Sequence, residues 1–189
     1  DYSFSYQYDH NWRVKGYSLL IGNDSINLVM NDYSEVGTLI TKHYDILPGD
    51  TLYNMDYRYN PRGWLTSINE VTTDLNQEIF GMELYYENPP QEAMVETKAQ
   101  YNGNISAMKW HSPYTQEGNT INTYAFLYDD LSRITKASYY ETSQGGTINV
   151  SLLDTTNLGL NSGFPTGLGS VGNITYDKNG NIESLARAF

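Results

Sequence analysis

The chain has 189 residues, no cysteine and a formal net charge of −11 at pH 7. This charge argues against nucleic-acid binding and against an anionic membrane surface, because both require basic patches. No apolar run approaches the roughly 20 residues that a membrane-spanning helix needs, and disulfides are excluded. The 18 tyrosines favour β-strands, whose pleated surface accommodates aromatic side chains.

Alternation of apolar and polar side chains predicts strands from the first residues onward. In DYSFSYQY, Tyr2, Phe4, Tyr6 and Tyr8 alternate with serine and glutamine, which predicts a strand over 2–8. A chain that opens within a strand is expected to be a piece of a longer one. The same reasoning predicts further strands at 13–21, 26–30, 38–44, 52–59, 64–69, 79–86, 105–110, 123–128, 133–140, 174–176 and 182–185.

Two stretches interrupt this series of strands. PQEAMVETKAQ, 90–100, contains helix formers but lies between strand units and is interpreted as a polar excursion. The region 143–172 is rich in Gly, Ser, Thr and Asn and is expected to be a loop-rich insertion, with at most one weak strand at 147–153. The expected fold class is therefore all-β, built from sequential antiparallel β-hairpins.

One turn motif occurs near the end of the chain. In YDKNGNI, Asp177 and Gly180 stand at the first and fourth positions of a type I turn, where these residue types are favoured. A three-residue hairpin loop of this kind places Tyr176 opposite Ile182. Such an aromatic–aliphatic cross-strand pair stabilises a sheet by roughly 0.2–1 kcal/mol.

The same frame recurs and predicts a repeat architecture. Units begin at Tyr8, Tyr33, Tyr59, Tyr101, Tyr128 and Tyr176, and three of the spacings are 25, 26 and 27 residues. A period of this size indicates stacked supersecondary units. The expected units lie near 8–21, 33–44, 59–70, 101–111, 128–140 and 176–187. Besides the tyrosines, the motif residues are Asp9, Gly37, Leu39, Gly63, Leu65, Gly103, Asp129, Ile134, Asp177, Gly180 and Ile182, and Trp12 and Ser132 replace Gly in two units.

The frame YDxxGRL resembles the YD repeat of Rhs-type proteins. The phrases FGMELYYENP, YNGNISAMKW and YDKNGNIESLAR are similar to the Bacteroidetes branch of that family. The resemblance implies one repeat array over 1–189, forming a segment of a spiral β-sheet shell in a bacterial cell-surface or secreted protein. Its partners would be further repeats of the same parent chain.

Some long relatives in that family are polymorphic toxins, whose self-cleaving core carries Asp-Pro motifs. This chain contains no Asp-Pro dipeptide. A toxin function is therefore not expected of the chain itself.

The search for chemistry finds no catalytic, cofactor or metal constellation. The three histidines have no paired metal-ligand spacing. The Asp177–Asn181 loop is similar to a calcium loop, but its glycine stands at the fourth position rather than the sixth. We therefore expect no enzyme activity, no metal and no cofactor.

Two functional interpretations remain. In the first, the chain is a non-catalytic scaffold: Tyr8, Tyr33, Tyr59, Tyr128 and Tyr176 should be largely buried against the aliphatic residue six positions on, with their hydroxyls bonded to a neighbouring unit. Tyr101, in a shorter unit, should do so less regularly. In the second, exposed aromatics form a carbohydrate-binding or adhesion surface, with Trp12, Trp64 and Trp110 as candidates.

Exposed outer strands at 2–8 or 182–185 also predict self-association.

Overall fold

A computed structural model describes residues 1–47, 50–71, 79–90, 97–112, 120–143, 148–149 and 171–187. Every regular element in these ranges is a β-strand, and none of the described residues forms a helix that could cross a membrane. The chain divides into two units, of which unit 1 contains Asp1–Asn69 and unit 2 contains Phe80–Phe189.

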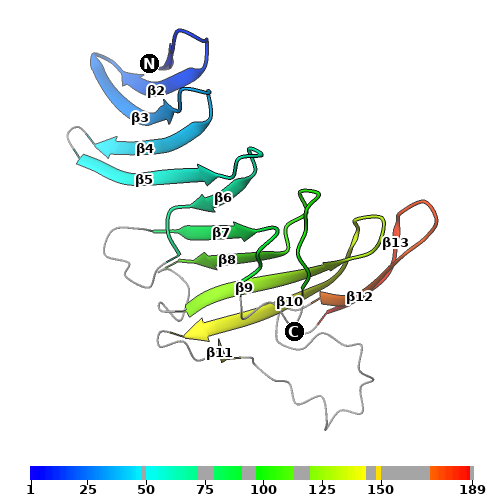
Figure 1. Ribbon diagram of the computed structural model, residues 1–189. Helices are drawn as coiled ribbons and strands as arrows, with labels where there is room; N and C mark the ends of the chain where they lie inside the picture. Colours follow the sequence, from blue (N-terminus) through cyan, green and yellow to red (C-terminus); the bar gives the residue numbers. More distant parts are fainter. Residues whose placement is uncertain are drawn as a thin grey trace. The chain divides into compact units, whose positions relative to one another are not determined.

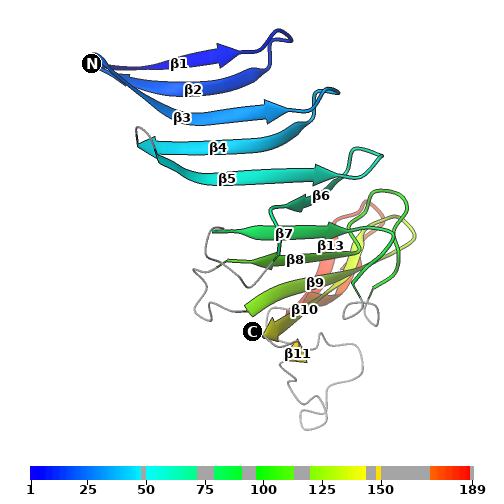
Figure 2. The same ribbon diagram turned by 60° about the vertical axis from the view of Figure 1, so that its left-hand side comes forward.

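Unit 1 is an antiparallel meander in which each strand pairs with the next one along the chain (Figures 1 and 2). Hairpins form because each strand is followed by a tight turn or a short connection, and neighbours in sequence become neighbours in the sheet. The strands are β1 Tyr2–Tyr8, β2 Val14–Ile21, β3 Asp24–Tyr33, β4 Leu39–Leu47, β5 Asp50–Tyr59 and β6 Leu65–Ile68.

Unit 2 continues the same style of pairing. Strand β10 pairs with β9 along its length, and its other neighbours are β12, near Ala137, and the short β11, near Glu141. The strands are β7 Gly81–Tyr85, β8 Ala107–His111, β9 Thr120–Tyr128, β10 Ile134–Ser143, β11 Ile148–Asn149, β12 Val171–Tyr176 and β13 Ile182–Arg187.

The sequential antiparallel all-β fold is confirmed, and each of the twelve strands expected from the sequence is present with boundaries shifted by a few residues. Strand β11 lies within the stretch 147–153, where a weak strand was predicted. Most of 143–172, and residues 91–96 of the polar excursion, lie outside the described residues.

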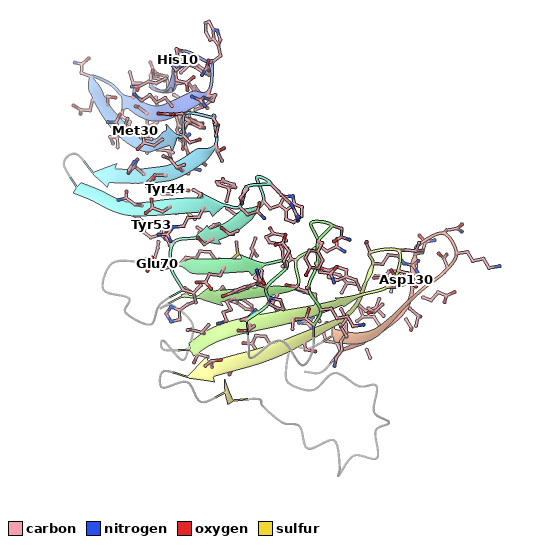
Figure 3. All side chains as sticks on the ribbon, viewed as in Figure 1. His10, Met30, Tyr44, Tyr53, Glu70 and Asp130 are labelled. Carbon is pink, nitrogen blue, oxygen red and sulfur yellow. The ribbon has the colours of Figure 1, made fainter. Side chains whose placement is uncertain are left out.

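The two faces of unit 1 differ in chemistry. Five directly paired residues cross the sheet in one row, Tyr6, Tyr17, Val29, Tyr44 and Tyr53, and therefore share a face. Figure 3 shows Tyr44 and Tyr53 on adjacent strands, and their rings stack with centroids 6.3 Å apart. Val29, which stands between Tyr17 and Tyr44 in this row, is only 3% exposed. This aromatic row gives unit 1 its apolar face.

The opposite face of unit 1 is polar. Ser18 donates a hydrogen bond to Asn27, and Thr41 donates one to Asp56 across neighbouring strands. His43 lies between β3 and β5, within 2.9 Å of Asp32 and 2.8 Å of Asn54. Alternation along the strands thus places these hydrogen-bonded polar side chains on the face opposite the aromatic row.

Unit 2 is packed more closely. Ala107 pairs with Ala125, which pairs with Ser138, and all three are fully buried. Tyr85 packs against the two alanines. The hydroxyl oxygen of Thr97 lies within hydrogen-bonding distance of two backbone carbonyls, those of Ser106 and Phe126, at 2.9 and 2.6 Å, and its one proton is available to either. A chain segment outside the strands is thereby fixed to this part of the sheet.

Candidate functional site: the junction between successive hairpins

The motif tyrosines pair with the predicted aliphatic residues at every full turn. The observed cross-strand partners are Tyr8 with Val14, Tyr33 with Leu39, Tyr59 with Leu65, Tyr128 with Ile134 and Tyr176 with Ile182. The register of all five hairpins is therefore as the turn chemistry predicted.

Each turn is closed by the residue that follows the tyrosine. The carboxylate oxygen Oδ1 of Asp177 accepts hydrogen bonds from the backbone N–H groups of Asn179 and Asn181, both at 2.8 Å. Gly180 N–H donates to the carbonyl of Asp177 at 3.1 Å, which closes the turn. The corresponding acceptors in the other turns are the side chains of Asp9, Ser34, Asn60 and Asp129.

The fifth motif residue adopts a left-handed conformation in every one of these turns. Gly37, Gly63 and Gly180 have φ of 89°, 79° and 87°, as expected for glycine. Trp12 and Ser132 occupy the same position with φ of 62° each. A side chain in this region costs roughly 1–2 kcal/mol. The turn geometry therefore dominates over local residue preference.

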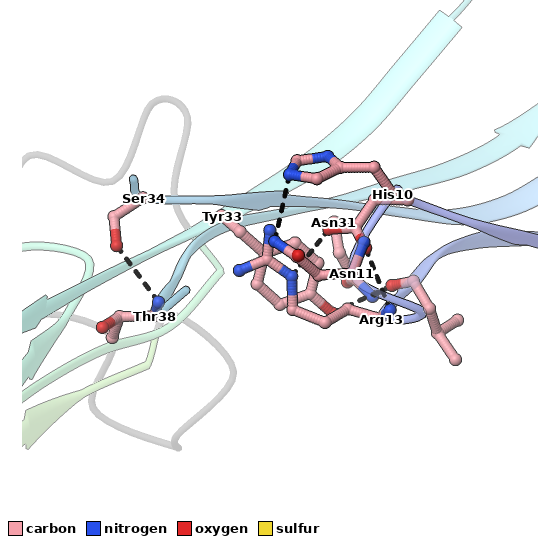
Figure 4. A network of polar contacts seen from close by, with 9 residues as sticks. His10, Asn11, Arg13, Asn31, Tyr33, Ser34 and Thr38 are labelled. Atoms are coloured by element: carbon pink, nitrogen blue, oxygen red, sulfur yellow. Dashed lines mark hydrogen bonds and ion pairs between the residues drawn. The ribbon is translucent and has the colours of Figure 1, made fainter. Parts of the chain in front are cut away.

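An arginine links the first turn to the next hairpin. Arg13 donates from Nε to Oδ2 of Asp9 at 2.6 Å, and its guanidinium lies 4.4 Å from the ring centroid of Tyr33 (Figure 4). The turn at Asp129 repeats the arrangement, with Arg133 bonded to Asp129 at 2.7 Å and 4.4 Å from the ring of Tyr176. A carboxylate in one hairpin thus orients a cation over the tyrosine of the next one.

Tyrosine hydroxyls complete the same junctions. Tyr33 donates to the carbonyl of Val14 at 2.9 Å, and Tyr176 donates to the carbonyl of Ile134 at 2.6 Å. Tyr128 donates to Ile105, in the shorter unit that begins at Tyr101, at 2.7 Å. In each case the acceptor is the aliphatic motif residue of the preceding unit. This confirms the predicted hydroxyl contact for these three tyrosines.

Asn31 reinforces the first junction. Its side-chain amide donates to the same Val14 carbonyl at 2.9 Å, so this carbonyl accepts two side-chain hydrogen bonds (Figure 4). Gly37 lies close to the junction, because a Cβ built on it would stand 2.8 Å from a guanidinium nitrogen of Arg13. The space that the arginine occupies therefore depends on glycine in the next turn.

The aspartates of these turns have lowered pKa values. For Asp129, the backbone N–H of Arg133 is the main cause, with the Arg133 side chain and the N–H of Leu131 adding to it. For Asp177, hydrogen bonds from Asn181 lower the pKa. For Asp9, desolvation works against the shift, but bonds from Arg13 and Asn11 outweigh it. Burial raises the pKa of the Tyr128 hydroxyl. The shifts favour ionised aspartates and a neutral Tyr128 hydroxyl, which are the forms that make the hydrogen bonds described above.

The predicted burial of the tyrosines needs a correction. Tyr33, Tyr59, Tyr128 and Tyr176 are half-buried, whereas Tyr8 is 53% exposed. Strand β1 is the outer strand of the described sheet in unit 1, so Tyr8 has a paired strand on one side only. Tyr101 is 68% exposed, which agrees with the expectation that its shorter unit is less regular.

The three candidate glycan-contacting tryptophans lie in different places. Trp12 and Trp64 belong to separate turns of unit 1, and Trp110 lies in β8 of unit 2. Trp12 is 85% exposed, while the guanidinium of Arg62 lies 4.9 Å from the ring of Trp64. Trp110 stacks on Tyr124 with centroids 5.5 Å apart. Only Trp12 therefore presents a largely uncovered ring.

Sequence reasoning missed the residues that join one hairpin to the next. Arg13 and Arg133 stand at the arginine position of the YDxxGRL frame, and this position was the available signal. Thr38, Trp64 and Asn181 replace arginine in the other turns. Asn181 instead donates from its side-chain amide to Asp177 at 2.8 Å. Asn31 and Thr97 had no sequence signal, because their acceptors are backbone carbonyls distant in the chain.

No metal-binding cluster accompanies these junctions in the part of the chain that the structure describes. Among those residues, no group of three or more His, Cys, Asp or Glu side chains could hold a metal ion. The arrangement is a structural contact between hairpins, made of a carboxylate, a guanidinium, an aromatic ring and a backbone carbonyl.

Comparison with known proteins gives structural similarity without a close relative. No family model and no curated protein matches the chain. Its whole length aligns with part of the crystal structure of TcdB2–TccC3–Cdc42, at 15% identity and a TM-score of 0.40, covering 11% of that chain. It also aligns with part of the Photorhabdus luminescens Tc holotoxin pore with a TccC3 variant, at 15% identity, a TM-score of 0.25 and 11% coverage. The chain spans about a tenth of the length of these much larger chains, and resembles one part of them at low identity.

Proposed function

We propose that the chain is a non-catalytic structural segment of a bacterial cell-surface or secreted YD-repeat protein, contributing hairpins to a β-shell scaffold. The junction between hairpins is the observation that carries this proposal. The motif residues Asp9, Arg13 and Tyr33 bond to or stack on one another, and Tyr33 also bonds to the carbonyl of Val14. Contacts of this kind join one hairpin to the next, which is what a scaffold requires.

The location and the parent assembly are part of the same proposal. They rest on the likeness of the repeated turn to the YD repeat of Rhs-type proteins. The partners would be further repeats of the parent chain. Their strands would pair with the outer strands in the way that each described strand pairs with its neighbour along the chain. No nucleic-acid or membrane-inserted partner is proposed, in keeping with the charge of −11.

The scaffold proposal is tested by separating stability from binding. We expect Tyr128→Ala to lower the free energy of unfolding by roughly 2–4 kcal/mol, because it removes a half-buried ring and its bond to Ile105. The same variant should change no glycan-array signal. A stable variant that had lost binding to a sugar would overturn the scaffold role.

A carbohydrate-binding or adhesion role is the second candidate, and Trp12 is the observation in its favour. This indole is 85% exposed and sits at a left-handed position that glycine occupies in other turns. The turn imposes this backbone conformation, but it does not require a tryptophan there, and a strained position occupied by a large side chain points to a use for that side chain. A glycan array that compares the natural chain with Trp12→Gly tests it, with Trp64→Phe as the matched control. Signal lost only in Trp12→Gly would favour adhesion.

A further inference from the structure

The chain contains two Asn-Gly steps, Asn102–Gly103 and Asn179–Gly180, and each continues with Asn and Ile. At an Asn-Gly step the asparagine side chain can react with the next backbone nitrogen, because glycine has no side chain that hinders the approach. The two glycines have φ of 98° and 87°, and both asparagines are exposed. Local sequence and exposure therefore do not distinguish the two steps.

Hydrogen bonds of the side chains do distinguish them. The Asn102 amide donates from Nδ2 to Oγ of Ser132 at 3.0 Å, and its Oδ1 accepts the backbone N–H of Asn104 at 3.1 Å. Both ends of this amide are therefore fixed. The backbone N–H of Asn179 donates to Asp177 at 2.8 Å, but none of the residues that the structure describes bonds to the Asn179 side-chain amide. This amide is therefore the one that can rotate toward the next backbone nitrogen.

The reacting nitrogen at the second step is held by one bond. Gly180 N–H donates to the carbonyl of Asp177 at 3.1 Å, and this bond must open before the nitrogen can attack. Attack at Asn102 requires both of its side-chain bonds to open. One neutral hydrogen bond changes such an equilibrium by roughly two- to tenfold. With one bond fewer to open, Asn179 should react faster by about this factor.

We propose that Asn179 is a site of spontaneous covalent modification, and that the contact with Ser132 protects Asn102 from the same reaction. The backbone nitrogen of Gly180 loses its proton to a solvent base and attacks the side-chain carbonyl carbon of Asn179. A new C–N bond forms, the bond to the side-chain nitrogen breaks, and ammonia leaves after it takes up a proton from solvent. Water then opens the five-membered succinimide at either carbonyl, which gives aspartate or isoaspartate.

Either product alters a turn that carries the repeat motif. Isoaspartate adds a methylene to the main chain of a tight loop, and both products place a second carboxylate close to Asp177, which accepts the N–H of Asn179. This turn sets the pairing of Tyr176 with Ile182, and the Tyr176 hydroxyl donates to the carbonyl of Ile134. Modification therefore loosens one hairpin and its junction with the preceding one. The inference goes beyond the scaffold role, because the reaction depends only on this turn.

Peptide mapping by mass spectrometry follows both steps in one sample of the full chain, incubated folded at mildly alkaline pH. Asn179 should convert roughly two- to tenfold faster than Asn102. Its rate should rise with pH, because the Gly180 nitrogen must lose a proton. In urea the two rates should become nearly equal, since the residues that follow each asparagine are the same. Equal rates in the folded chain, or a difference that persists in urea, would overturn the proposal.

Variants test the cause and the consequence. Ser132→Ala removes the acceptor of the Asn102 amide and should speed conversion there by roughly two- to tenfold, whereas Leu131→Ala, at the neighbouring exposed residue, should not. An unchanged Asn102 rate in Ser132→Ala would contradict the protective contact. Incubation should also speed amide hydrogen exchange across β12 and β13 in the natural chain, but not in Asn179→Gln, because glutamine cyclises far more slowly. Equal exchange in both incubated chains would contradict the loosening of the hairpin.

Discussion

Unit 1 and unit 2 use the same hairpin turn, but they cover it differently. In unit 1 the sheet has an outer strand whose motif tyrosine, Tyr8, is 53% exposed. In unit 2 the hydroxyl of Thr97 holds an additional segment against the sheet, and Ser106 and Ala125 have no exposed surface. The difference shows that the stabilising effect of a repeat residue depends on what lies over it, and not on the motif alone.

The largest expected effect is a difference in stability lost on truncation between two motif tyrosines, one that is half-buried and one that is exposed. Tyr8→Ala should lower the free energy of unfolding by less than about 1 kcal/mol, because an exposed ring buries little apolar surface on folding. Tyr128→Ala, at the same motif position in unit 2, should cost several times more. Urea unfolding followed by tyrosine fluorescence and circular dichroism measures both. Equal costs would contradict the importance of the covering hairpin.

The next effect compares two glycines at the same turn position. Gly63→Ala should lower stability by about 1 kcal/mol through the left-handed backbone alone, because no atom lies within 4 Å of its Cβ position. Gly37→Ala should cost more, because its Cβ would stand 2.8 Å from the guanidinium of Arg13. In an Arg13→Ala background the two costs should become equal. A difference that persisted there would show that Arg13 is not its cause.

These comparisons also show where sequence reasoning succeeds. The pairing of Tyr176 with Ile182 follows from a local turn rule, and the strands follow from alternation within a few residues, so both were predictable. The exposure of Tyr8 was not, because it depends on the absence of a neighbouring strand. The contact between Arg13 and Tyr33 was missed for a related reason: it joins residues of different hairpins, and turn chemistry acts only within one.

A smaller effect, of opposite sign, is expected at the two turns without glycine. Trp12→Gly and Ser132→Gly should raise stability by about 0.5 kcal/mol each, because relief of the left-handed strain exceeds the entropic cost of glycine. Thermal unfolding of each variant measures this. Matched changes at the neighbouring exposed turn residues, Asn11→Gly and Leu131→Gly, should give no gain. A loss at Trp12 would mean that its ring makes a stabilising contact.

The smallest effect concerns pH. Since the folded-state pKa of Asp129 is lowered, its contribution is complete above the unfolded-state pKa, near 4, and is lost as pH falls through the folded value. The melting temperature should therefore drop in acid, and Asp129→Asn should make it drop less. Asparagine keeps the turn, as Asn60 does in unit 1. If the melting temperature fell equally with pH in both proteins, Asp129 would not contribute to the loss of stability in acid.

The most direct test of the junction is a double-mutant cycle between Arg13 and Tyr33. Arg13→Met, Tyr33→Leu and the double variant are compared by equilibrium unfolding, so the separate Asp9–Arg13 and Tyr33–Val14 bonds cancel. We predict a favourable coupling of about 0.5–1 kcal/mol, in the range for a guanidinium over an aromatic ring that is still partly in contact with solvent. The control cycle between Arg13 and Tyr59 should give a coupling near zero. A coupling near zero for Arg13 and Tyr33 as well would contradict the claim that arginine ties one hairpin to the next.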